Sequence, residues 1–297
     1  MRFLRFLARE LLLHGVVFAV VGTIVLSILY LLSIGAPSEA YLEAAQSFLL
    51  FISGNTNTKV IGFSSGQIIA SGAAVTLPLA VISLIFIILI SLICSSFAVS
   101  SRYMAVNFGK HTGEKFDAVW NLIASVFAAI PLFVGFWVYY VVIGDGISFP
   151  LITFALIAFV TVAFGGLAWD ATNFLKTDML AQVGQTHAIV YSTLGQKMGS
   201  FFPSKGSYTG YLFSSSLPRF IPYLAGKVPA IIGSVTIAEI ALNFPGLGKN
   251  LIDALIETKT DLLVTSVFVL LCINAIVSLL VKTVLFLIYP RVYEKAI

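Results

Sequence analysis

Charged side chains are scarce in this chain. They make up 10% of its 297 residues, with 17 Lys and Arg against 13 Asp and Glu. Soluble domains are about one quarter charged, so this scarcity excludes an ordinary soluble enzyme. Apolar residues reach 59%, and the mean hydropathy is +1.03. A polytopic membrane protein is the ordinary class that fits this balance, and the net charge of +4 gives no indication of nucleic-acid binding.

Residues that commonly carry catalysis or hold metals are also few. The histidines, His14, His111 and His187, are far apart in the sequence. Cys94 and Cys272 lie inside apolar runs without metal-ligand spacing. The sequence contains no H-E-x-x-H and no Gly-rich loop ending in Gly-Lys-Ser/Thr. We therefore expect no catalytic site, no metal and no cofactor on this chain, and any ATP hydrolysis would belong to a partner protein.

Long apolar segments dominate the chain instead. Six of them are long enough to cross about 30 Å of hydrocarbon. The first follows three arginines, but its apolar stretch is too long for a signal peptide, so we expect an uncleaved helix. We predict an all-α, polytopic membrane protein with six transmembrane helices in a single domain, residues 1–297. The six segments span residues 11–32, 73–99, 118–142, 149–169, 220–241 and 262–289.

Lys and Arg are unevenly distributed between the predicted loops. If the N-terminus is cytoplasmic, twelve of them lie inside, and only Lys59, Lys249 and Lys259 lie outside. Positive charge favours the cytoplasmic side of a membrane, so we predict that both termini are cytoplasmic. The extracellular segments are then residues 33–72, a tight turn at 144–148, and the last loop, 242–261.

The longest predicted inner segment, residues 170–219, exceeds what a connection between two neighbouring helices needs. It is either a docking element or a disordered connector. Within it, the run Thr193-Leu-Gly-Gln-Lys-Met-Gly places Gly195 and Gly199 at small-x-x-x-small spacing around Lys197. A small residue lets another backbone approach closely, and a glycine can end a helix.

The last outer loop contains the motif Pro245-Gly-Leu-Gly, within a run from Glu239 to Asp253. We predict a sharp, exposed reversal here, because Pro245 restricts φ while Gly246 and Gly248 allow conformations that other residues resist.

Charged residues within the apolar segments need partners, water or a route to the membrane surface. Glu239 could line a substrate entrance or bind backbone amides of the Pro-Gly-Leu-Gly turn. Lys227 is expected to snorkel, and Lys282 either snorkels or pairs with Asp170. Asp253 belongs to an acidic stretch that either contacts a partner or a cationic substrate, or is a solvated helix face.

The Pro-Gly-Leu-Gly loop resembles the last extracellular loop of the membrane permease subunit of ABC importers for dipeptides, oligopeptides and nickel. Other motifs resemble the same family. They are the basic entry Met-Arg-Phe-Leu-Arg-Phe, Ser65-Gly-Gln followed by Ala74-Val-Thr-Leu-Pro, Ala129-Ile-Pro-Leu-Phe133, and the closing Tyr289-Pro-Arg. Tyr289 and Lys282 stand where this family usually has acidic residues, so the chain resembles a divergent member.

This resemblance implies a type I importer in the plasma or inner membrane of a prokaryote. The chain would form a pathway with a second, homologous permease, receive a peptide or related small solute from an extracytoplasmic binding protein, and depend on two ABC ATPase subunits that bind ATP and Mg. Thr193, Gly195, Lys197 and Gly199 would dock the ATPase. Pro78, Pro131, Pro222 and Pro229 would either bend their helices or serve as static packing features.

Two alternatives remain at this point. An ion-gradient-driven secondary transporter would favour paired ionisable groups at the membrane midplane and internal inverted repeats, and the sequence shows neither. A non-transport structural membrane subunit is the other alternative. The transported solute and the identity of the partner permease are open.

Overall fold

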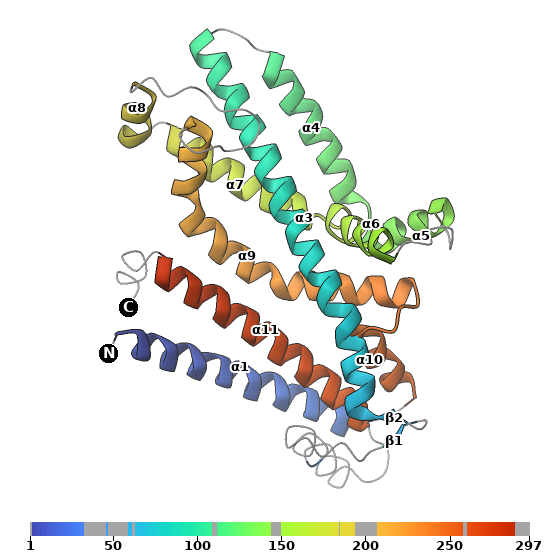
Figure 1. Ribbon diagram of the computed structural model, residues 1–297. Coiled ribbons are helices and arrows are strands. Elements are labelled where there is room, and N and C mark those ends of the chain that lie inside the picture. The colour runs from blue at the N-terminus through green and yellow to red at the C-terminus, as the bar shows by residue number, and fades with distance from the viewer. Residues whose placement is uncertain are drawn as a thin grey trace. The chain divides into compact units, whose positions relative to one another are not determined.

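The structure is a computed structural model, and it describes residues 2–32, 46, 59–60, 63–108, 112–143, 150–183, 185–193, 207–257 and 260–288. Nearly all of these residues are helical (Figure 1). The exception with regular structure is an antiparallel pair of two-residue strands, β1 (Lys59–Val60) and β2 (Phe63–Ser64). The helices are α1 (Arg2–Leu32), α3 (Ser65–Phe108), α4 (Thr112–Ala129), α5 (Leu132–Ile143), α6 (Pro150–Ala163), α7 (Leu167–Val183), α8 (Thr186–Thr193), α9 (Tyr208–Ala241), α10 (Leu247–Ile256) and α11 (Thr260–Ile288).

Four of the described helices, α1, α3, α9 and α11, are each long and apolar enough to cross a membrane. The number rises to six if the bent pairs α4–α5 and α6–α7 each count as one span. The predicted all-helical, multi-span architecture is therefore confirmed at this level. The number six and the cytoplasmic position of both termini stay predictions.

The predicted membrane segment 118–142 is interrupted at Pro131, one of the prolines that the sequence analysis named as a possible bend. Helix α4 ends at Ala129, α5 begins at Leu132, and the two are bent by 94°. Proline has no N–H to donate, and its ring collides with the preceding helical turn. Helix α5 begins anew from this residue, since the amides of Val134 and Gly135 donate to the Pro131 carbonyl at 3.0 and 3.3 Å.

The predicted helix over residues 149–169 is also broken, at two glycines between α6 and α7. Gly165 and Gly166 have φ values of 78° and 91°, a left-handed region that strongly favours glycine. The helices meet there at 63°. Across the break, the indole Nε1 of Trp169 donates to the Ala163 carbonyl at 2.7 Å, which satisfies an acceptor at the end of α6.

Helix α7 continues well past the predicted membrane boundary. It ends at Val183, and α8 and the first part of α9 follow, so much of the predicted inner segment 170–219 is helical. That segment therefore carries more regular structure than a disordered connector would. Helix α7 contacts α4, α6 and α8, and Trp120 and Phe127 of α4 hold ring contacts to the indole of Trp169.

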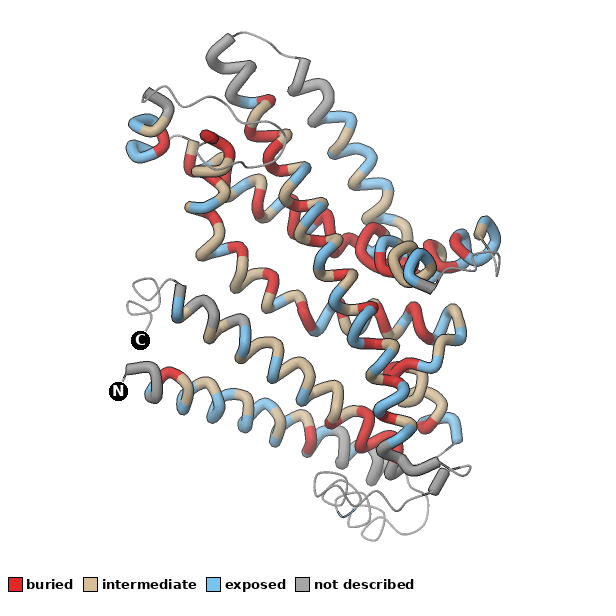
Figure 2. Tube along the Cα trace, in the orientation of Figure 1, coloured by how far each residue is buried: buried red, intermediate tan, exposed pale blue. Residues whose placement is uncertain are grey.

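The chain divides into two compact units, one comprising Met1–Pro78 and Val235–Thr283, the other Leu79–Ser234 and Val284–Ile297. The first unit has a small core around Ile69, Leu247 and Leu262. Its α1 is mostly exposed, and only 6% of its apolar span is buried within the chain (Figure 2). Such a helix is typical of a surface that faces lipid.

Candidate functional site

The candidate site lies in the first unit, where α9 ends and α10 begins. The end of α9 has a Schellman motif: the Phe244 amide donates to the Glu239 carbonyl at 2.8 Å, and the Asn243 amide donates to the Ile240 carbonyl at 3.4 Å. Asn243 holds the left-handed position with φ 58°. Asparagine tolerates this conformation better than most residues, so the helix can reverse without a glycine at that point.

The N-terminus of α10 is capped by side chains from two other helices. The Glu239 carboxylate of α9 accepts hydrogen bonds from the Gly248 amide at 2.8 Å and the Lys249 amide at 3.3 Å. The Thr76 hydroxyl of α3 accepts from the Leu247 amide at 2.9 Å and donates to Glu239 Oε1 at 2.6 Å. The first amides of a helix have no partner inside it, and α10 has no side-chain cap of its own at Gly246.

Burial makes this cap more important than an ordinary surface cap. Glu239 is 0% exposed and Thr76 is 1% exposed. A buried carboxylate requires several hydrogen bonds, and the positive end of the α10 dipole stabilises its charge. The sequence left two roles open for Glu239. In the structure, its carboxylate accepts hydrogen bonds from backbone amides of this turn.

The predicted exposed reversal at the glycines is wrong. Gly246 has φ −96°, and Gly248 lies inside α10, so neither adopts the left-handed conformation. Both are buried, and only Pro245 of the three is exposed. Glycine is required here for space: a Cβ on Gly246 would meet the Glu239 carboxylate, and one on Gly248 would meet Thr236, each closer than 3.0 Å.

The α3 side of the site was mostly missed by the sequence analysis. Gly72 lies so close to α10 that a Cβ would come within 2.7 Å of Asn250 Nδ2. Asn250 in turn donates to the Ile68 carbonyl at 3.2 Å. Thr76 was noted only within a family motif, and it is separated from Leu247 by 171 positions. No local pattern indicates a contact over that distance, and the polar types of Thr76 and Asn250 were the available signal.

Asp253 lies on the partly exposed side of α10. Its carboxylate is 3.5 Å from Lys249 Nζ, an i,i+4 ion pair, and its side chain is 46% exposed. Lys249 Nζ also donates to the side-chain oxygen of Asn243. The described part of this predicted outer segment therefore presents paired charges to its surroundings.

The predicted docking residues are only partly within the described structure. Thr193 is the last residue of α8, while Gly195, Lys197 and Gly199 lie outside the described residues. Helix α8 contacts the start of α9 in the second unit through Tyr211. The ring of Tyr191 stacks on Tyr211 at 4.1 Å and 9°, and the Tyr211 hydroxyl is 3.1 Å from His187 Nδ1.

Asp170 and Lys282, which the sequence analysis considered as a possible ion pair, each have another partner. Asp170 accepts from Lys227 Nζ at 3.1 Å, and Lys282 Nζ lies 2.5 Å from the carboxylate of Glu10 in α1. Lys227 also lies over the ring of Tyr223 at 5.4 Å. Lys227 and Lys282 therefore each form an ion pair within their own unit. The sequence analysis had expected both mainly to snorkel. Among the described residues, no three His, Cys, Asp or Glu side chains gather as metal ligands would.

Comparison with known proteins gives a limited similarity. The chain is 28% identical over 82 residues to the oligopeptide transport system permease protein AmiC of Streptococcus pneumoniae serotype 4 (strain ATCC BAA-334 / TIGR4), and equally to that of strain ATCC BAA-255 / R6. The matched residues are 28% of this chain and 16% of each relative. No protein-family model matches the chain. The chain is thus a helical protein with several potential membrane spans that is similar over part of its length to permease proteins.

Proposed function

We propose that this chain is a membrane-spanning permease subunit of an ATP-driven, binding-protein-dependent importer for peptides or a related small solute. The observation that carries the proposal is the similarity over 82 residues to an oligopeptide transport permease protein. The long apolar helices of the described chain support it, since a permease has to span the bilayer. The chain would reside in the plasma or inner membrane of a prokaryote, with both termini in the cytoplasm.

The capped junction between α9 and α10 suits an outer docking surface for an extracytoplasmic binding protein. Its buried hydrogen bonds from Thr76 and Glu239 place α10 in a definite orientation. A preorganised surface loses less conformational entropy when a partner binds. The side chains of Ile256 and Asp253, 74% and 46% exposed, would face that partner.

Helix α8 suits a docking element for an ATPase. It is short and, apart from the buried Ala188, largely exposed, with Ile189 and Val190 at 52% and 53% exposure. Exposed aliphatic side chains on a short helix are typical of a protein contact. The predicted docking residues Thr193, Gly195, Lys197 and Gly199, which follow in the sequence, would take part in the same contact. ATP and Mg would be bound by the two partner ATPases, and a second permease would complete the pathway.

The test is to purify the chain in mild detergent from its native membrane and to identify the proteins that accompany it by mass spectrometry. We expect an ABC ATPase and a second permease. Replacement of Gly199 by Trp should release the ATPase while the second permease stays bound. Gly199→Ala is the matched control, because alanine keeps a small residue at the docking position, and it should retain the ATPase.

A chain that purifies alone, under conditions that keep an established importer intact, would contradict the proposal. The ion-gradient transporter and the structural membrane subunit would then be the better hypotheses.

A further inference from the structure

Helices α7 and α9 of the second unit are joined by a regular series of side-chain contacts. The contributing residues recur every four positions on each helix: 170, 174, 178 and 182 on α7, and 215, 219, 223 and 227 on α9. Residues four apart lie on one face of a helix, and the two helices run antiparallel along this face. We call these four pairs the α7–α9 ladder.

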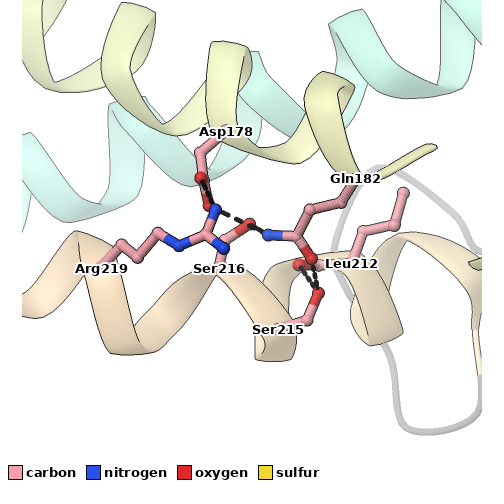
Figure 3. Close-up of polar contacts among 6 residues, drawn as sticks. All are labelled: Asp178, Gln182, Leu212, Ser215, Ser216 and Arg219. Carbon is pink, nitrogen blue, oxygen red and sulfur yellow. Dashed lines mark hydrogen bonds and ion pairs between the residues drawn. The ribbon is translucent and has the colours of Figure 1, made fainter. Parts of the chain in front are cut away.

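The two pairs nearest α8, Gln182–Ser215 and Asp178–Arg219, belong to a connected polar network (Figure 3). Gln182 Nε2 donates to Ser216 Oγ at 2.8 Å and to Asp178 Oδ2 at 3.0 Å, and Gln182 Oε1 accepts from Ser215. The second oxygen of Asp178 is 2.5 Å from Arg219 Nη1. Gln182 and Ser216 are 5% and 0% exposed. Every polar atom of the Gln182 amide therefore has a partner in a buried place.

The other two pairs of the ladder are a ring stack and an ion pair. Phe174 stacks on Tyr223 at 4.1 Å and 11°, and Asp170 pairs with Lys227 at 3.1 Å. The Lys227 ammonium lies over the same Tyr223 ring. Along this face the four pairs are, in order, a hydrogen bond, an ion pair, a ring stack and a second ion pair. A shift of one helix along the other would separate all four.

Glycine and proline residues lie on both helices beyond one end of the ladder, the end formed by the Asp170–Lys227 pair. On the α7 side, Gly165 and Gly166 separate the ladder from α6, and their backbones have the freedom that glycine allows. On the α9 side, Pro229 follows the last pair, and Gly233 has nothing within 4 Å of where a Cβ would be. The boundary between the compact units falls just after it, at Ser234.

We propose that the α7–α9 ladder positions the docking helix α8, so that α7, α8 and the first part of α9 move as one rigid piece. The movement of an attached ATPase would then reach the rest of the chain through Gly165–Gly166 and through the Pro229–Gly233 stretch. Within this piece Pro222 is a static feature, because it lies between ladder residues. This inference rests on the proposed function for the identity of the partner, and on the contacts alone for the rigid piece.

The physical basis is the cost of separating buried polar partners. Leaving a buried polar group without its hydrogen-bond partner is destabilising, and contacts within one network are energetically coupled. Helix α8 follows α7 after Val183 and meets α9 through Tyr211, so it is held at both of its sides. Asp178, Gln182 and Arg219 are positioning residues in this scheme, because they act on α8 through α7 and α9.

The first test measures the placement of α8 without any partner. Spin labels at Thr186→Cys and Ser214→Cys, both exposed positions, report the distance between α8 and α9 in a chain with C94S and C272S. We expect a narrow distance distribution for the intact ladder and a broader or shifted one for D178R and for R219D. The double variant D178R/R219D restores opposite charges and should recover the narrow distribution. T177R is the matched control, because it adds the same side chain at an exposed neighbouring position.

Unchanged distributions in both single variants, or a double variant as broad as the singles, would overturn the rigid piece. If D178R fails to fold, as judged by size-exclusion chromatography, Gln182→Leu is used instead. It removes hydrogen bonds of the same network without adding a charge.

The second test measures coupling in the complex with its co-purified ATPase in nanodiscs. D178R should retain the ATPase but lose most of its ATP turnover, and D178R/R219D should regain it. Full turnover in D178R would overturn the coupling role. If the wild-type chain recovers no ATPase, the proposed function fails, while the distance measurement still decides whether the ladder is rigid.

Discussion

Glu239 is the residue on which the junction between α9 and α10 depends. Its carboxylate and the Thr76 hydroxyl together satisfy three amides at the start of α10. Apolar replacements of these side chains leave buried donors without partners, which is more damaging than loss of an exposed hydrogen bond. The hydroxyl of Thr76 is particularly constrained, since it has a single proton and gives it to Glu239.

We predict that Thr76→Val lowers the free energy of unfolding by about 1–3 kcal/mol, because the Leu247 amide and Glu239 Oε1 both lose a partner. Thr23→Val is the matched control. The hydroxyl of Thr23 donates only to the carbonyl of Ala19 on its own helix, so its loss should change stability by about 0.5 kcal/mol or less. Unfolding in mixed micelles, followed by circular dichroism, measures both. Equal effects of the two substitutions would contradict the cap.

Glycine substitutions should have opposite effects at two positions. Gly246→Ala forces a Cβ against the Glu239 carboxylate and should destabilise by about 1–3 kcal/mol. Gly233→Ala meets open space inside α9 and should stabilise by about 0.5–1 kcal/mol, since alanine is the better helix former. Apparent melting temperatures in one detergent compare the two variants. A stabilising effect of Gly246→Ala would contradict the close approach of Gly246 to the Glu239 carboxylate.

At the scale of elements, hydropathy anticipated where the chain can cross a membrane and missed where it turns. Residues 118–142 and 149–169 are continuously apolar, and an apolar run does not distinguish a straight helix from two halves. Pro131 was recognised as a possible bend, but a 94° break depends on the packing around it. Gly165 and Gly166 resemble any small pair in a membrane helix until their φ values are known. The α7–α9 ladder was unpredictable because it joins residues from two helices.

The break between α6 and α7 provides a prediction at this scale. Gly166→Ala should destabilise the protein by about 1–2 kcal/mol, because an alanine at φ 91° is strained. The substitution Gly15→Ala in α1, where nothing lies within 4 Å, is the control and should not destabilise. Chemical unfolding of both variants in micelles provides the comparison. If Gly166→Ala matches the control, the two helices can meet without a left-handed residue.

For the whole molecule, the distribution of Lys and Arg predicts which loops face the cytoplasm, and a labelling experiment can check this directly. On a chain with C94S and C272S, Ile256→Cys in α10 should react with a membrane-impermeant maleimide in intact cells. Thr186→Cys in α8 should react only after the membrane is permeabilised. Both positions are exposed, so access from the water on each side decides the outcome. The reverse labelling pattern would invert the predicted orientation.

The ion pair between Glu10 and Lys282 has a consequence for how the chain is made. It connects residues 272 positions apart, in α1 and α11, and the Glu10 side chain is only 13% exposed. During synthesis α1 is made first, so almost the whole chain has to be made before Lys282 is available to pair with Glu10. A ribosome that stops before α11 therefore releases a product with an uncompensated acid in its first helix. The ion pair therefore distinguishes a finished chain from an unfinished one, because only the finished chain can balance the Glu10 carboxylate with Lys282.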